Sequence, residues 1–172
     1  MIKDIKDKVV LITGASSGIG KAIAYELMLM GNRVYGTSRK VVTGSTRIYP
    51  DSVSKDQKVV EEGMGFIEMV QLDVRSEESI KNAVEYVVKK EGHIDILINN
   101  AGYGIAGAIE DTTYEEAFSQ FDTNFFGVMR ICRNVVPIMR REGKGLIINI
   151  SSVAGLISIP FQSMYSASKF AL

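Results

Sequence analysis

The chain has 172 residues, of which 46% are hydrophobic, and its 20 basic and 20 acidic residues give a formal net charge of zero. This length and composition favour one folded domain over a disordered chain, and the balanced charge gives no reason to expect a nucleic-acid or anionic-membrane partner. A single cysteine, Cys132, excludes an intramolecular disulfide, and with a single histidine, His93, it leaves no Cys/His metal site to expect.

The amino-terminal residues 1–8 carry charges but contain neither an apolar core nor a small-residue cleavage site, so they do not form a secretory signal. No uncharged apolar run approaches the roughly 18 residues that a membrane span requires. We therefore expect a soluble, cytoplasmic protein without a membrane partner.

Short apolar runs alternate with longer amphipathic stretches, which is the pattern of repeated βαβ units in an α/β fold with a doubly wound parallel sheet. The first of these runs, residues 8–13, predicts a strand that is buried on both faces. The five predicted strands span residues 8–13, 33–37, 65–72, 94–99 and 145–150.

Helices are predicted between these strands from apolar periodicity and from capping residues. The first ends at Gly31, the second follows a Ser76 cap, and the third begins at Thr112 or Thr113 and is kinked by Pro137. Their ranges are 19–30, 77–91 and 113–141, with a further short helix at 54–62 in the polar stretch 40–65. The pattern is still helical at 166–172, so we expect the chain to end within a helix.

A glycine-rich turn, T-G-A-S-S-G-I-G, joins the first strand to the first helix. Gly14 permits the tight turn, Gly18 lets the backbone approach a pyrophosphate, and Gly20 permits close packing of helix on strand. The unpaired N–H groups of the helix N-terminus favour phosphate, and Ser16 and Ser17 add hydroxyl donors. The turn therefore predicts a dinucleotide site, although glycines also occur in ordinary turns.

The end of the second strand indicates which dinucleotide binds. An NAD-selective site places an acid there to accept hydrogen bonds from the ribose, but this strand ends in G-T-S-R-K. Arg39 could contact a 2′-phosphate in bidentate fashion, with Ser38 and Lys40 beside it. NADP(H) is therefore the preferred cofactor and NAD(H) the alternative, whereas a solvated basic loop would explain the same cations without a ligand.

A second group of reactive side chains follows the fifth strand. Tyr165 and Lys169 are four residues apart, so a helix places them on one face, where the ammonium group would stabilise a phenolate. A tyrosine in this setting can exchange a proton with a carbinol oxygen while a nicotinamide exchanges hydride. The Ser152 hydroxyl could hold the same oxygen in place, and Ser151 is expected to be structural.

These residues together resemble the short-chain dehydrogenase/reductase family, over essentially the whole chain. Residues 13–20 are similar to its T-G-x-x-x-G-I-G cofactor turn, residues 99–102 to its N-N-A-G element, and Tyr165 with Lys169 to its Y-x-x-x-K pair. The resemblance implies a Rossmann-like, three-layer αβα fold with strand order 3-2-1-4-5, in one NADP(H)-binding domain spanning residues 1–172.

The resemblance also assigns roles to individual residues. It implies that Asp73 contacts the adenine amino group and that residues 99–102 support the sheet on the adenine side. It implies a catalytic tetrad consisting of Asn124, Ser152, Tyr165 and Lys169. The expected cofactor-binding residues are Gly14, Ser16, Ser17, Gly18, Ile19, Gly20, Ser38, Arg39, Asp73, Val74, Asn100, Ala101, Gly102, Tyr165 and Lys169.

The expected activity is NADP(H)-dependent interconversion of an alcohol and a ketone or aldehyde, with Tyr165 as the general acid/base, in a homodimer or homotetramer paired through the 113–141 helix. Family members usually continue past the Y-x-x-x-K helix with two further strands, so the chain is expected to be C-terminally incomplete and catalytically impaired. The apolar run 153–161 favours a hydrophobic substrate such as a steroid, retinoid or fatty-acyl derivative, although plain loop packing explains it equally well.

Two other functions remain open on the sequence. One is a non-catalytic dinucleotide-binding or sensing module on the same fold, which would have no need to keep the four tetrad residues together. The other is a methyltransferase, which also has a glycine-rich turn after its first strand. It would place an acid after the second strand and has no use for Tyr-x-x-x-Lys.

Overall fold

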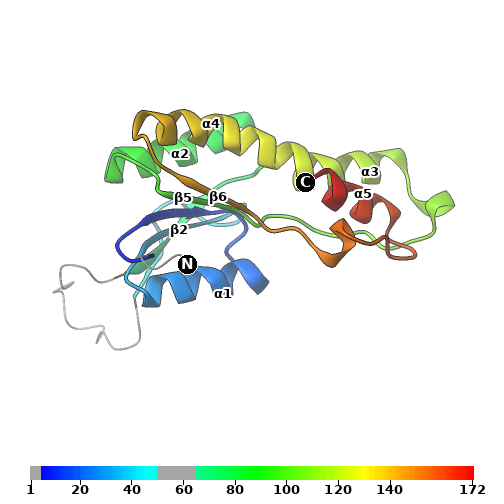
Figure 1. The fold of residues 1–172 in the computed structure, drawn as a ribbon, viewed down its shortest axis with the longest axis horizontal. Coiled ribbons are helices and arrows are strands. Elements are labelled where there is room, and N and C mark those ends of the chain that lie inside the picture. The colour runs from blue at the N-terminus through cyan, green and yellow to red at the C-terminus, as the bar shows by residue number, and fades with distance from the viewer. Residues whose placement is uncertain (1–4, 50–64) are drawn as a thin grey trace.

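A computed structural model of the chain describes residues 5–49 and 65–172 (Figure 1). Its sheet has six strands in the order β3-β4-β2-β1-β5-β6, and all pairs of neighbouring strands are parallel except β3 with β4. The strands are β1 (Val9–Ile12), β2 (Arg33–Ser38), β3 (Arg47–Ile48), β4 (Phe66–Gln71), β5 (Ile96–Asn99) and β6 (Leu146–Asn149). The five predicted strands and their order 3-2-1-4-5 are confirmed.

The strand β3 is an addition to the predicted architecture. Arg47 and Ile48 pair antiparallel with Glu68 and Ile67 of β4, so the sheet is mixed rather than purely parallel. Two residues are too few to show an alternating or continuous apolar pattern, which is why the sequence did not indicate this strand. The short helix predicted at 54–62 lies outside the described residues.

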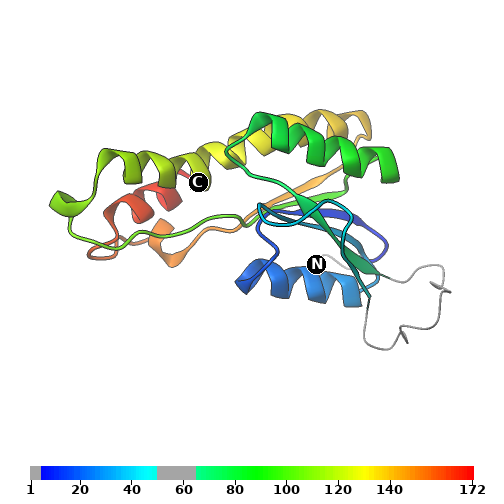
Figure 2. The ribbon, with the colours of Figure 1, turned by 180° about the vertical axis from the view of Figure 1, so that it is seen from behind.

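Helices cover both faces of the sheet, as Figures 1 and 2 show from opposite sides. Helix α1 (Gly18–Leu29) packs on one face, and α2 (Glu77–Glu91) and α4 (Gly127–Arg141) pack on the other. Successive side chains of a strand point to opposite faces, so the residues of β1 divide between two apolar cores. Val9 and Leu11 join the core beneath α2 and α4, while Val10 and Ile12 join the core beneath α1.

The predicted caps Ser76 and Thr113 are observed, and Gly92 is a further cap that was not predicted. The Ser76 hydroxyl accepts from the backbone N–H of Ser79 at 3.2 Å, and Gly92 ends α2 in the left-handed region with φ 79°. Of the two candidate caps for the long helix, Thr113 is the one used, in a reciprocal capping box with Glu116.

The long helix is not a uniform α-helix. It consists of α3 (Tyr114–Phe121), one π turn (Asp122–Phe126) and α4, which continues through Pro137 to Arg141. Single π turns inside helices frequently mark functional sites, and this one contains Asn124. Two short 3₁₀ turns, Ile109–Asp111 and Val153–Gly155, precede α3 and α5 (Ser163–Ala171).

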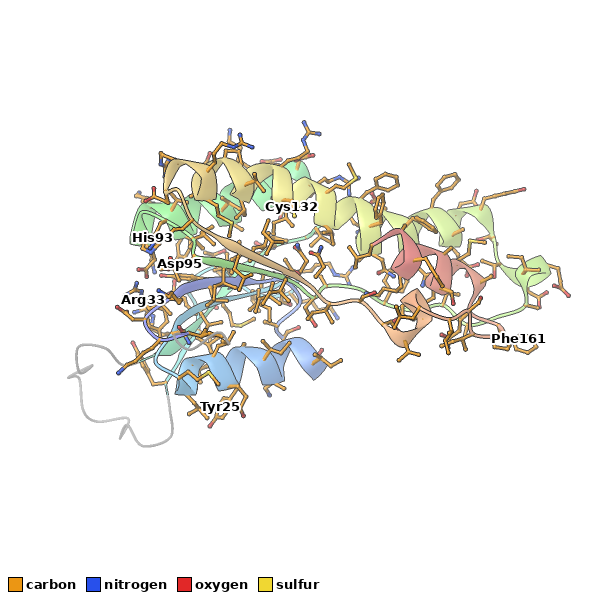
Figure 3. The ribbon with its side chains drawn as sticks, viewed as in Figure 1. Tyr25, Arg33, His93, Asp95, Cys132 and Phe161 are labelled. Carbon is orange, nitrogen blue, oxygen red and sulfur yellow. The ribbon has the colours of Figure 1, made fainter. Side chains whose placement is uncertain are left out.

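A charged cluster fixes the amino-terminal ends of β1 and β5, far from the loop that carries Phe161 (Figure 3). The Asp95 carboxylate accepts from the backbone N–H of Val9 at 3.0 Å and lies 3.1 Å from His93 Nε2 and 3.5 Å from Lys144 Nζ. Burial raises the pKa of Asp95, but the Val9 N–H and the charges of His93 and Lys144 outweigh it and hold the pKa below its ordinary value.

Asp95→Asn is expected to lower the free energy of unfolding at neutral pH by about 1–3 kcal/mol, because a charged hydrogen-bond acceptor is lost from a buried position. A carboxyl with a depressed folded-state pKa stabilises the fold above its unfolded pKa, and this contribution disappears as pH falls through the folded value. Urea unfolding between about pH 7 and pH 3 should therefore show the wild-type advantage shrinking toward acid. Asp111→Asn, at an exposed position, is the control. A difference that is independent of pH would contradict the assignment.

Candidate functional site

The glycine-rich turn is shaped by two left-handed glycines and one crowded glycine. Gly14 and Gly18 have φ values of 69° and 56°, a region that favours glycine. A Cβ at Gly20 would lie 2.3 Å from Asn100 Nδ2 and 2.4 Å from the Gly14 carbonyl oxygen, whereas a Cβ at Gly18 would meet nothing within 4 Å. Gly20 thus lets the turn close on itself, and the space at Gly18 remains open for a ligand.

The turn is tied to the carboxyl end of β5 by Asn100. Its Nδ2 donates to the carbonyl oxygens of Thr13 and Gly14 at 2.9 and 3.0 Å. In the other direction, the Thr13 hydroxyl accepts from the backbone N–H groups of Asn100 and Ala101, both at 3.0 Å. The N-N-A-G element therefore fixes the turn at the carboxyl edge of the sheet, where open α/β folds bind ligands.

One cleft of about 850 Å³ runs from this turn to Tyr165 and Lys169. Every residue expected to bind the cofactor lines it, including Ser38, Arg39, Asp73 and Val74. Several further residues that were not predicted from the sequence also line the cleft, among them Arg75, Tyr103, Ser119 and Thr123. Arg75 had a usable signal, since it follows the carboxyl end of a predicted strand two residues after Asp73.

Arg75 and Asp73 form a two-pronged ion pair in the wall of the cleft. Arg75 Nε lies 3.2 Å from Asp73 Oδ1, and Nη2 lies 3.0 Å from Oδ2. The hydrogen bond from Arg75 is the main reason that the pKa of Asp73 lies below its ordinary value. Arg39 also acts on the Asp73 carboxylate, and the exposed Arg39 and Lys40 line the same cleft. The cations among these lining residues therefore outnumber the carboxylate.

The far end of the cleft contains Tyr165 and Lys169 of α5. Lys169 is only 7% exposed, its Nζ donates to the Ile150 carbonyl oxygen at 2.9 Å, and the same atom lies 6.0 Å from the centre of the Tyr165 ring. Burial lowers the pKa of Lys169. The spacing of four residues has therefore placed the two groups together, as the sequence predicted.

Asn124 lies behind the cleft wall. Its Nδ2 donates to the Tyr103 carbonyl oxygen at 2.9 Å and to the Ser168 hydroxyl at 3.0 Å, and its Oδ1 accepts from the Tyr103 N–H at 3.1 Å. A Cβ at Gly102 would come within 3.0 Å of that Oδ1. Asn124 thus connects α5 to the strand-end loop beside Lys169.

Ser152 differs from Tyr165 and Lys169 in that its side chain caps a turn outside the cleft lining. It caps the 3₁₀ turn, with its hydroxyl oxygen accepting from the Ala154 N–H at 3.1 Å, and it is not among the residues that line the cleft. Its hydroxyl proton is not used in that bond and remains available to a ligand. Its neighbour Ser151 lines the cleft and also donates to the Lys169 carbonyl oxygen at 3.4 Å, so it has the structural contact that was expected of it.

Comparison with known proteins decides the family. The sequence profile described as short chain dehydrogenase matches residues 8–172. The chain belongs to the short-chain dehydrogenase family. This family uses nicotinamide dinucleotides as cofactors.

Two curated relatives and one solved structure illustrate the similarity. The chain is 45% identical to the 3-ketodihydrosphingosine reductase of Bacteroides thetaiotaomicron, over 98% of this chain and 55% of that protein. It is 38% identical to the human 17-beta-hydroxysteroid dehydrogenase type 1, over 95% of this chain and 48% of that one. A short-chain dehydrogenase from Streptomyces avermitilis superposes with a TM-score of 0.79 at 38% identity, over 96% and 56% of the two chains. The chain thus spans about half the length of the relatives it matches.

Residues 5–49 and 65–172 contain no grouping of three or more His, Cys, Asp or Glu side chains suited to a metal ion. Nor does any helix within these ranges have the length and apolarity needed to cross a bilayer.

Proposed function

We propose that the protein is an NADP(H)-dependent oxidoreductase that interconverts a hydrophobic ketone and its alcohol. The observation that carries this proposal is one continuous cleft, which joins the glycine-rich turn and Arg39 at one end to Tyr165 and Lys169 at the other. A dinucleotide is long enough to need both ends, and the chemistry would take place where the tyrosine lies.

The cleft suits a phosphorylated dinucleotide. The open space at Gly18 and the helix N-terminus of α1 fit a pyrophosphate, and the cations Arg39, Lys40 and Arg75 fit a further phosphate on the adenosine ribose. When bound, the nicotinamide supplies or accepts the hydride.

The side chains of this protein would manage the proton and the orientation of the substrate. In reduction, the Tyr165 hydroxyl donates its proton to the carbonyl oxygen as hydride reaches the carbonyl carbon, so one ketone gains one hydride and one proton. The buried Lys169 ammonium, held by the Ile150 carbonyl oxygen, stabilises the phenolate that is left. The Ser152 hydroxyl proton is available to orient the same carbonyl oxygen.

A hydrophobic substrate is supported by the loop after β6. Its apolar side chains are exposed, with Leu156 at 79%, Phe161 at 70% and Val153 at 64%. Phe161 also has φ 60°, an unusual value for a bulky residue, and its carbonyl oxygen accepts from the Gly107 N–H at 2.8 Å. The two relatives described above are named for 3-ketodihydrosphingosine and for a 17-beta-hydroxysteroid, which agrees with an apolar substrate.

Arg39→Ala tests the cofactor assignment. The variant is expected to weaken NADPH binding by about 10- to 100-fold and to leave NADH binding unchanged, because it removes a charge-assisted contact that only the 2′-phosphate makes. Titration calorimetry with both dinucleotides measures this, with Arg140→Ala, an exposed arginine outside the cleft, as the control. An equal loss of affinity for NADPH and for NADH would show that Arg39 does not contact the 2′-phosphate.

We also propose that residues 1–172 belong to one domain and that two copies pair through α3 and α4. Tyr114, Phe118, Phe126 and Met129 are exposed at 82%, 71%, 43% and 47%, and their spacing forms an apolar stripe along this helix. Phe118→Lys is expected to shift the protein toward monomer in sedimentation velocity, because a buried charge at a pairing surface is costly. An unchanged sedimentation coefficient, with the far-ultraviolet circular dichroism preserved, would place the contact elsewhere.

A further inference from the structure

A buried carboxylate lies on the sheet outside the cleft. Glu68 of β4 is only 2% exposed, and its Oε1 accepts from Lys90 Nζ at 2.6 Å and from the Tyr86 hydroxyl. Its Oε2 accepts from Arg47, with Nε at 2.8 Å. Burial raises the pKa of Glu68, but the bonds from Lys90, Tyr86 and Arg47 outweigh it and hold the pKa below its ordinary value.

The two cations that neutralise Glu68 come from different parts of the fold. Lys90 is near the end of α2 and extends over the Tyr86 ring, 4.6 Å from its centre. Arg47 is on β3, and its guanidinium lies 4.2 Å from the centre of the Phe66 ring. Glu68 therefore connects the edge strand β3 to the body of the domain. The two-residue ladder between β3 and β4 would by itself hold β3 only weakly.

The segment between β2 and β3, residues 39–46, lies along β4 and is held there by individual hydrogen bonds. The Gly44 N–H donates to the Met69 carbonyl oxygen, and the Met69 N–H donates to the Thr46 carbonyl oxygen, both at 3.0 Å. The Gln71 N–H donates to the Thr43 hydroxyl, also at 3.0 Å. A Cβ at Gly44 would lie 2.7 Å from the Tyr86 hydroxyl, so the segment packs directly on the Glu68 cluster.

The same segment begins with the cations that face the cleft. Arg39 and Lys40 follow the last residue of β2, Ser38, whose carbonyl oxygen accepts from the Leu72 N–H at 3.1 Å. One end of the segment is therefore fixed by the sheet and the other by Arg47 on Glu68. Arg39 and Lys40 therefore lie between these two anchors along the chain.

We propose that Glu68, through its ion pair with Arg47, is a positioning residue that holds the 39–46 segment so that Arg39 faces the 2′-phosphate of NADP(H). This inference rests on the proposed cofactor preference and adds a determinant on β3 and β4, outside the residues that line the cleft. Cofactor selectivity in this protein then depends on a buried carboxylate as well as on the arginine that makes the contact.

Arg47→Met and Glu68→Gln test the proposal, with dissociation constants measured for NADPH and NADH. Each variant is expected to reduce the preference for NADPH by about three- to tenfold, with NADH affinity and kcat at saturating NADPH unchanged. Arg47→Lys, which keeps the charge, should restore part of the preference. Arg33→Met is the matched control, because Arg33 on β2 pairs with Asp7 and Glu91 and does not contact the 39–46 segment. It should lower the Tm without changing the preference.

The outcomes separate this inference from the proposed function. A wild-type protein without any preference for NADPH would overturn the cofactor assignment and this inference with it. A clear wild-type preference that survives in both Arg47→Met and Glu68→Gln would overturn this inference alone. Should either variant fail to fold, Tyr86→Phe removes one hydrogen bond to Glu68 while keeping the ring, and an NADPH preference unchanged in that variant would count against the proposal.

Discussion

Replacing Tyr165 by phenylalanine is expected to lower kcat for carbonyl reduction by about 10²- to 10⁴-fold, the usual contribution of a positioned general acid. The ring would still pack against Gly104, where a Cβ would come within 3.3 Å of it, so the fold and the cleft should persist. NADPH affinity should stay within about twofold, because the loss falls on the chemical step rather than on binding. Steady-state oxidation of NADPH and calorimetric binding measure the two quantities.

The control for this prediction is Tyr114→Phe, which removes the hydroxyl of an 82% exposed tyrosine on α3. It should leave kcat unchanged. A Tyr165→Phe protein that binds NADPH normally and retains more than about a tenth of the wild-type kcat would show that another group donates the proton.

Gly20→Ala is expected to abolish dinucleotide binding and to destabilise the domain. The added methyl group would lie 2.4 Å from the Gly14 carbonyl oxygen and 2.3 Å from Asn100 Nδ2, so the turn or the Asn100 amide must move. Moving that amide breaks its two bonds to the turn, and overpacking of this kind costs about 1–3 kcal/mol or more. Thermal melts with and without NADPH should show a lower Tm and no upward shift on adding the dinucleotide.

Gly143→Ala separates this effect from the general cost of replacing a glycine. Gly143 has φ 69°, but a Cβ there would meet nothing within 4 Å, and the residue is not among those that line the cleft. That variant should lose about 1 kcal/mol of stability from backbone strain and keep its NADPH-dependent rise in Tm. A Gly20→Ala protein that binds NADPH as tightly as wild type would mean that the turn does not hold the phosphates.

The parts of the fold that were predictable depend on interactions between residues close in sequence. The apolar run Val9–Ile12 predicts a strand that is buried on both faces, and Ser76 predicts a helix cap. Each of these signals involves only residues that are a few positions apart in the sequence. The spacing of Tyr165 and Lys169 is likewise a local property of one helical turn.

The parts that were missed depend on contacts between residues distant in sequence. The strand β3 depends on the ion pair between Arg47 and Glu68 and on the backbone pairing of Arg47 with β4. Neither residue's sequence neighbours indicate that the two residues are in contact. The π turn at Asn124 departs from the prediction for 113–141, which was an α-helix kinked only near Pro137. The cap formed by Ser152 on Ala154 depends on how the loop after β6 folds, which no local pattern specified.

The central claim is tested most directly by measuring hydride transfer from NADPH to a long-chain ketone. The two readouts are the loss of nicotinamide absorbance and the amount of alcohol formed. The purified protein is expected to form one alcohol for each NADPH oxidised, at whatever rate it turns over. NADPH should work at lower concentration than NADH, and Tyr165→Phe should lower kcat by about 10²- to 10⁴-fold. Tight NADPH binding without transfer to any ketone of a graded series, and without transfer from the matching alcohols to NADP⁺, would contradict this claim and indicate a binding module.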